Sequence, residues 1–296
     1  MRRAILIVPL VLFAALLWWL AAGMDLQLAR WAAGWQRDFQ NQLAGILRSL
    51  RAHETGASGV LLTLCFGYGF FHALGPGHGK VIIGGYGLGR NVPLLRLSLI
   101  SVLAALGQAT TAILLVWLGM LTLGLTRTQL TTLAEGHLIS ASAVATGLVG
   151  LWLAFRGAAK LLRQRQAATH SDHHHHDDHC GCGHSHGPTP EQLRQSGSLR
   201  EMLALILGIA IRPCSGAILL LVLTWHMGIL TAGLLGVIAM SMGTATLTIV
   251  VAGLSVFARE TTVLSAGQAG YSRQVLPLFE VLAGLGIAAL SLGMIA

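Results

Sequence analysis

The chain carries little charge for its length. Only 10% of its 296 residues are Asp, Glu, Lys or Arg, whereas soluble domains carry about 25%. Hydrophobic residues make up 54%, and the mean hydropathy is +0.70. Lys and Arg outnumber Asp and Glu by 19 to 11, but they lie mostly between apolar runs, where they set membrane topology. The composition therefore indicates an integral membrane protein of several helices and no nucleic-acid partner.

Cysteine and nucleotide-binding motifs are also scarce. The chain has four cysteines, two in apolar runs (Cys65 and Cys214) and two in a His-rich loop, which is not the pattern of a secreted disulfide framework. It lacks the Gly-rich Lys-Ser/Thr loop that cradles a nucleotide phosphate and the His-Glu-x-x-His of a metalloprotease. These absences disfavour an ATP-driven pump and make an intramembrane metalloenzyme the less favoured alternative.

Apolar runs predict an all-α, polytopic membrane protein with about seven transmembrane helices. Residues 1–23 hold the first helix, which becomes a cleaved signal peptide in the alternative with six helices. Residues 24–58 are expected to form an amphipathic external segment near the interface. Six further runs follow, near 59–83, 98–124, 138–155, 202–225, 229–257 and 276–296.

The alternation of Lys and Arg between these runs predicts the topology. With Arg2 and Arg3 inside, residues 156–201 form a cytoplasmic loop and the C-terminus lies outside. The four arginines of the 24–58 segment oppose this rule, although long external segments are less bound by it.

The stretch from His72 to Lys80, His-Ala-Leu-Gly-Pro-Gly-His-Gly-Lys, interrupts one of the apolar runs. Ionisable groups in hydrocarbon normally face a cavity or a partner and indicate function. Pro opposes a regular helix and Gly permits turns, so a discontinuous helix is expected, with His72 and His78 turned toward one point. The motif positions between and beside them are Gly75, Pro76, Gly77, Gly79 and Lys80. A Pro-kinked packing helix with satisfied histidines is the structural alternative.

The two halves of the chain, 59–155 and 202–296, resemble each other and are expected to form two inverted three-helix repeats. The second interrupted run contains Arg212, Pro213 and Cys214, and paired interruptions of this kind point to a transport site between repeats. Cys214 is a candidate soft ligand or a small apolar filler, and Arg212 pins the broken helix or snorkels to the interface.

Other polar residues in the apolar runs have two interpretations each. Glu280 is a proton carrier or a partner for Arg212. The remaining four either line a path or form hydrogen bonds between helices, namely Gln108, Thr110, Thr244 and Thr246.

The loop between the halves carries most of the chain's 13 histidines. Imidazole, carboxylate and thiol ligands suit borderline metals, and no packed core can form from this composition. We interpret the loop as a capture or buffering arm, with a solvated linker as the alternative. Its candidate ligands are His170, Asp172, His173, His174, His175, His176, Asp177, Asp178, His179, Cys180, Cys182, His184 and His186.

The His72–Lys80 motif, the stretch from Arg212 to Ala217 and the His-rich loop together resemble the nickel/cobalt transporters that export these metals from bacteria. The resemblance covers most of the chain. It implies translocation of Ni²⁺ and Co²⁺ through the inner membrane by a multi-pass protein that is not an enzyme and has no resident cofactor. It also implies that His72 and His78 handle the metal. Transport of zinc and metal import remain the alternatives.

Overall fold

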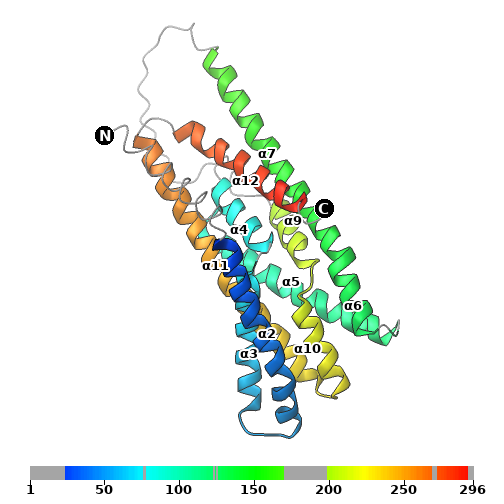
Figure 1. The fold of residues 1–296 in the computed structure, drawn as a ribbon. Coiled ribbons are helices and arrows are strands. Elements are labelled where there is room, and N and C mark those ends of the chain that lie inside the picture. The colour runs from blue at the N-terminus through cyan, green and yellow to red at the C-terminus, as the bar shows by residue number, and fades with distance from the viewer. Residues whose placement is uncertain are drawn as a thin grey trace.

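The structure, a computed structural model, describes residues 24–75, 78–122, 124, 126–169, 199–268 and 272–292. Within these residues every regular element is a helix (Figure 1). The all-α prediction is therefore confirmed. The expected first helix, in residues 1–23, lies outside the described part of the chain.

Four of the described segments are long and apolar enough to cross a membrane: Ala57–Leu74, Leu94–Leu121, Thr128–Arg163 and Leu230–Thr262. A fifth arises if Leu199–Ala210 and Ser215–His226, which are bent by 59° at a short break, count as one span. These spans confirm a polytopic membrane protein. Within the described part of the run expected near 276–296, the apolar helical stretch is Glu280–Ala289, which is shorter than a membrane span.

The first interrupted run forms two helices. α3 (Ala57–Leu74) ends at the glycine cap Gly75, and α4 (His78–Gly89) begins three residues later. The break falls where the sequence predicts it, and the helix after it is longer than expected because Tyr86 and its neighbours continue to pack inside the protein.

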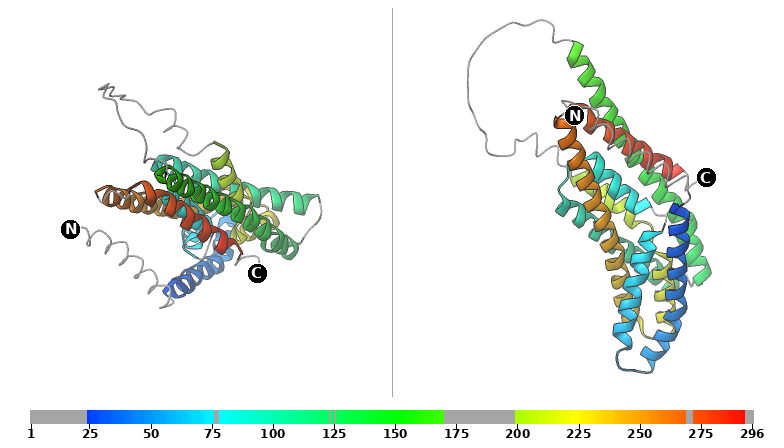
Figure 2. Two further views of the ribbon diagram at one scale, coloured as in Figure 1. Left: turned by 90° about the horizontal axis from the view of Figure 1, so that it is seen from above. Right: turned by 60° about the vertical axis from the view of Figure 1, so that its left-hand side comes forward.

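The segment expected to lie at the interface instead forms a packed helix. α2 (Met24–Arg51) pairs with α3 (Figure 2), burying Ala32, Leu43 and Leu47 while leaving Trp31 and Trp35 half exposed. α2 is amphipathic as predicted, but only part of its apolar face packs on protein, and the rest is exposed.

The remaining helices complete two sets, each with one broken helix. The first set adds α5 (Leu94–Leu121), α6 (Arg127–Leu133), the π-helical η1 (Ala134–Leu138) and α7 (Ile139–Thr169). The second contains α9 (Leu199–Ala210), α10 (Ser215–His226), α11 (Leu230–Gln268) and α12 (Ser272–Leu292).

The two sets interlock. α3 packs mainly on α11, α9 packs on α5, and α7 lies against α12 (Figure 1). Each broken helix therefore leans on a long helix of the other set, as two repeats related by a pseudo-twofold axis would. The inverted membrane orientation of the repeats stays a prediction.

Close helix approach depends on glycine at the α3–α11 crossing. A Cβ atom at Gly243 would overlap the carbonyl oxygen of Phe66 on α3. Because that neighbour is backbone, only a shift of the whole helix could make room.

This crossing gives a stability prediction. Gly243→Ala should lower the thermal unfolding temperature of the purified protein, since overpacking costs about 1–3 kcal/mol. Gly45→Ala on α2, where nothing lies within 4 Å of the added methyl group, is the control. It should leave the unfolding temperature unchanged or raise it, because Ala favours helix over Gly. A wild-type unfolding temperature for Gly243→Ala would show that the helices do not cross as described.

Candidate functional site

A cavity of about 130 Å³ lies where the two broken helices meet. It is lined from α3, α4, α5, α11 and the α9–α10 break. The polar side chains that face it include His72, Lys80, Gln108, Arg212, Cys214 and Thr244. Three candidates from the two interrupted motifs, His72, Arg212 and Cys214, are thus brought to one place from positions about 140 residues apart.

His72 and Cys214 form the chemical centre of the cavity. His72 occupies the last turn of α3, and Cys214 is the N-cap of α10. Their side chains lie close to each other in the cavity lining. The ring of Tyr68 stacks on the imidazole, with centroids 5.9 Å apart and planes 9° apart. One nitrogen donor and one soft sulfur donor therefore share one wall.

The start of α10 surrounds the Cys214 sulfur with polar groups. The backbone N–H groups of Gly216 and Ala217 lie near the sulfur, although neither forms a regular helix-capping bond with it. A helix N-terminus favours a negative charge. The position of Cys214 therefore suits a thiolate and favours the soft-ligand interpretation over the apolar filler.

Lys80 holds the first break together. Its ammonium group donates to the carbonyl oxygens of Leu74 at 2.8 Å and Gly75 at 2.6 Å. These carbonyls end α3 and have no partner within the helix. Lys80 is therefore a cap across the break, a role that the motif alone did not reveal.

Side chains on the two long helices also bond to backbone carbonyls of both broken helices, at the end of α9 and within α3. Gln108 on α5 donates to the Ile209 carbonyl at 3.2 Å, and Thr244 on α11 donates to the Gly69 carbonyl at 3.1 Å. Each follows a glycine, Gly107 or Gly243, at which an added Cβ would clash with the other set. The interhelical hydrogen bonds predicted as one alternative for Gln108 and Thr244 are therefore present, and both residues also line the cavity.

Other candidates do not meet in the cavity. Thr110 and Thr246 are exposed and bond to their own helices. Gly79 and Pro213, by contrast, are part of the cavity lining. His78 begins α4, but its side chain lies outside the described part, as do Pro76, Gly77 and all loop candidates from His170 to His186. Among the described residues no three His, Cys, Asp or Glu side chains gather closely enough to hold a metal ion.

Sequence reasoning missed two glutamines on α2. Gln36 contacts His72 and the Phe71 carbonyl, and Gln40 donates to the Tyr68 hydroxyl at 3.2 Å. Their spacing of four residues places both on one face of a helix. In the sequence, only this spacing indicates that the two glutamines act together. It does not show which helix their side chains contact.

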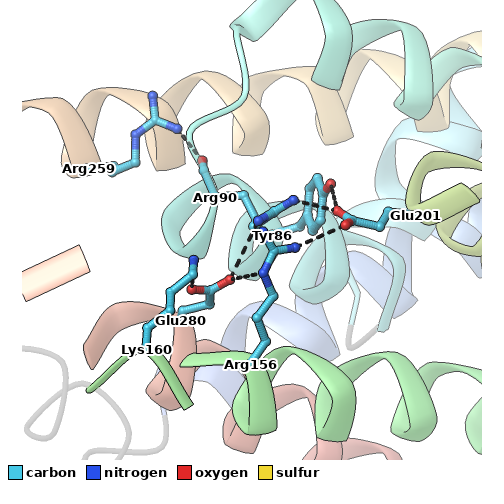
Figure 3. A network of polar contacts seen from close by, with 7 residues as sticks. All are labelled: Tyr86, Arg90, Arg156, Lys160, Glu201, Arg259 and Glu280. Carbon is cyan, nitrogen blue, oxygen red and sulfur yellow. Dashed lines mark hydrogen bonds and ion pairs between the residues drawn. The ribbon is translucent and has the colours of Figure 1, made fainter. Parts of the chain in front are cut away.

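A buried charge network lies at the far ends of α4 and α9 (Figure 3). Arg90 pairs with Glu201 at 2.7 Å, and Arg156 pairs with Glu201 at 3.0 Å and with Glu280 at 3.5 Å. Lys160 reaches Glu280 at 2.5 Å. The Glu280 and Arg90 side chains are only 1% and 3% exposed, so the network ties α4, α7, α9 and α12 together in the interior.

The network corrects two expectations. Glu280 does not pair with Arg212, because its ion pairs are with Arg90, Arg156 and Lys160, and Arg212 instead lines the cavity near His72. Arg90 and Arg156 are among the Lys and Arg residues between apolar runs, for which the sequence predicts only a role in membrane topology. Both side chains are mostly buried, and both pair with the carboxylate of Glu201. For Arg90 this partner lies more than 100 residues away along the chain.

Two comparisons relate the chain to known proteins. Residues 59–188 match the NicO family, described as high-affinity nickel-transport proteins. A protein of Haemophilus influenzae, provisionally named a nickel/cobalt efflux system, is 32% identical over 244 residues, which cover 78% of this chain and 76% of that protein. No solved structure matches the chain.

The network yields a prediction on stability. Glu280→Gln should lower the free energy of unfolding by about 3–5 kcal/mol, because it leaves buried cations short of a partner. Lys160→Gln, at a side chain 43% exposed, should cost less than about 1 kcal/mol. Thermal unfolding of the two purified variants measures the difference. Equal unfolding temperatures would show that Glu280 is not neutralising buried charge.

Proposed function

This chain belongs to the family of nickel/cobalt transporters, and we propose that it exports Ni²⁺ and Co²⁺ across the inner membrane of a bacterium, with His72 and Cys214 holding the metal in transit. The observation that carries the proposal is the meeting of these two side chains in a cavity between two broken helices. The efflux named for the Haemophilus influenzae relative supports the direction.

The donors suit the substrate. Imidazole and thiolate both bind borderline divalent metals such as nickel and cobalt. With two described protein donors, the ion keeps other ligands, for which water is the simplest source, and a cavity of about 130 Å³ has room for several waters at about 30 Å³ each. A partly hydrated ion on few protein ligands can leave quickly, as transport requires.

Electrostatics around the cavity balance attraction against release. α3 and α9 end there, and the carbonyl ends of helices attract cations. Lys80 and Arg212 contribute positive charge to the same lining. The ammonium group of Lys80 points to the two carbonyls that it caps and donates its hydrogen bonds to them. The two donors therefore bind the metal ion in a cavity whose lining is not strongly negative, which favours release.

The interlocked sets suit alternating access. Because each broken helix packs on a long helix of the other set, tilting one set against the other would move His72 relative to Cys214. Proton coupling fits the same pair, since a metal ion binds the Cys214 thiolate and a neutral His72, and protonation of either donor opposes binding. Glu280 forms ion pairs in the charge network rather than lining the described cavity, so it is given no part in this coupling.

The His-rich loop serves, in this proposal, as a cytoplasmic arm that captures metal before it reaches the cavity. Its imidazole and thiol content supports capture. No catalytic reaction and no resident cofactor are assigned, because metal is the cargo and the two donors have no catalytic carboxylate beside them in the described cavity lining.

Accumulation of radioactive nickel tests the proposal in cells that lack other nickel transporters. At matched membrane levels the wild-type protein should lower accumulation. His72→Gln and Cys214→Ala should reduce the rate of export at least about tenfold, since each removes a donor. Cys65→Ala is the control, because Cys65 is a buried cysteine of the same core that does not line the cavity. His78→Gln tests the second histidine of the motif.

The contrary outcomes are distinct. Higher nickel accumulation with the wild-type protein would mean import. Normal export by a His72→Gln, Cys214→Ala double variant would show that the pair is structural. Repeating the assay with cobalt and zinc decides whether zinc is a substrate as well.

A further inference from the structure

Gln36 touches the proposed ligand His72 from outside both repeats. It lies on α2, before the residues that match the nickel-transport family. Its amide makes two contacts on α3: Nε2 donates to the Phe71 carbonyl at 3.2 Å, and Oε1 lies 3.4 Å from Nδ1 of His72.

The first contact determines the chemistry of the second. A backbone carbonyl only accepts hydrogen bonds, so the Phe71 oxygen must face the NH₂ group of Gln36. The amide oxygen is then left to face His72, and because it too only accepts, Nδ1 of His72 must carry the proton. A neutral His72 therefore has its lone pair on Nε2.

The surroundings hold Gln36 in this orientation. The Phe71 ring stacks on Trp35 at 5.5 Å and lies 5.8 Å from Phe39, so aromatic packing holds α2 and α3 together beside the contact. One turn further along α2, Gln40 bonds to Tyr68, whose ring lies parallel to the imidazole of His72. α2 thus fixes both the proton and the plane of the ring.

We propose that Gln36 is a positioning residue that sets the tautomer of His72 and so presents Nε2 to the metal ion. The inference rests on the proposed function, in which His72 is a ligand. Groups that orient a metal-binding histidine through its other nitrogen typically change metal affinity 10–100-fold when removed. Loss of Gln36 should therefore weaken nickel and cobalt binding by about 10–100-fold.

Two substitutions distinguish a residue that sets the tautomer of His72 from one that only stabilises the packing of α2 on α3. Gln36→Leu removes both contacts. Gln36→Glu keeps an acceptor for Nδ1 but loses the donor to the Phe71 carbonyl. Gln42→Leu, the same change at an exposed glutamine of the same helix, is the matched control. If Gln36 positions His72, the Glu variant behaves like the wild type and only the Leu variant fails.

The first measurement needs no metal. Nitrogen NMR of purified full-length protein with labelled histidine reports the tautomer, and the His72 resonances are assigned by their loss in His72→Gln. The Nδ1–H form is expected in the wild type, Gln36→Glu and Gln42→Leu. Gln36→Leu should shift His72 toward the Nε2–H form that an unconstrained neutral imidazole favours.

The second measurement is cobalt titration followed by thiolate absorption, in full-length protein carrying Cys180→Ser and Cys182→Ser so that the loop contributes no sulfur. Gln36→Leu should need about 10–100-fold more cobalt, and the other two variants should match the wild type. An unchanged tautomer in Gln36→Leu overturns the inference. An equal loss of affinity in Gln36→Leu and Gln36→Glu, together with lowered unfolding temperatures, also overturns it. That result would show that Gln36 only stabilises the packing of α2 on α3. If His72→Gln leaves cobalt affinity unchanged, it is the proposed function that fails, and the tautomer result still stands on its own.

Discussion

The central constraint on this molecule is the set of backbone carbonyls that two broken helices leave unpaired inside a membrane protein. Hydrocarbon offers no water to satisfy such groups, and each costs several kcal/mol if left alone. The structure meets them with side chains from other helices: Lys80 of α4 bonds the carbonyls at the first break, and Gln108 of α5 bonds a carbonyl at the second. The caps therefore decide which helices must stay together.

The same caps build the cavity. Gln108 anchors α9 to α5, and the Thr244 hydrogen bond anchors α3 to α11, so that His72 on one broken helix lies beside Cys214 on the other. α4 and α9 then run away from the cavity to the charge network, where Arg90 and Glu201 join their far ends. Because the caps and the network join the same helices, a movement that separates His72 from Cys214 must strain one of them.

Local sequence was sufficient for the features that local physics controls. Pro76 and its glycines predicted the break, and long apolar runs predicted membrane helices, because chain stiffness and hydropathy act over few residues. Pairing across long separations was not predictable. Arg90 looked like a topology signal until the fold placed Glu201 beside it, and Gln36 had no visible partner without the packing of α2 on α3. The roles of His78 and the His-rich loop stay predictions.

Protection of Cys214 from alkylation tests most directly whether metal occupies the cavity. The protein would carry Cys180→Ser and Cys182→Ser, and mass spectrometry would follow modification of Cys214 by a small thiol reagent in membranes. Nickel and cobalt should slow the reaction while magnesium does not, because a soft thiolate ligand discriminates against hard cations. His72→Gln should raise the nickel concentration needed for protection. An alkylation rate that saturating nickel leaves unchanged would contradict metal binding between His72 and Cys214.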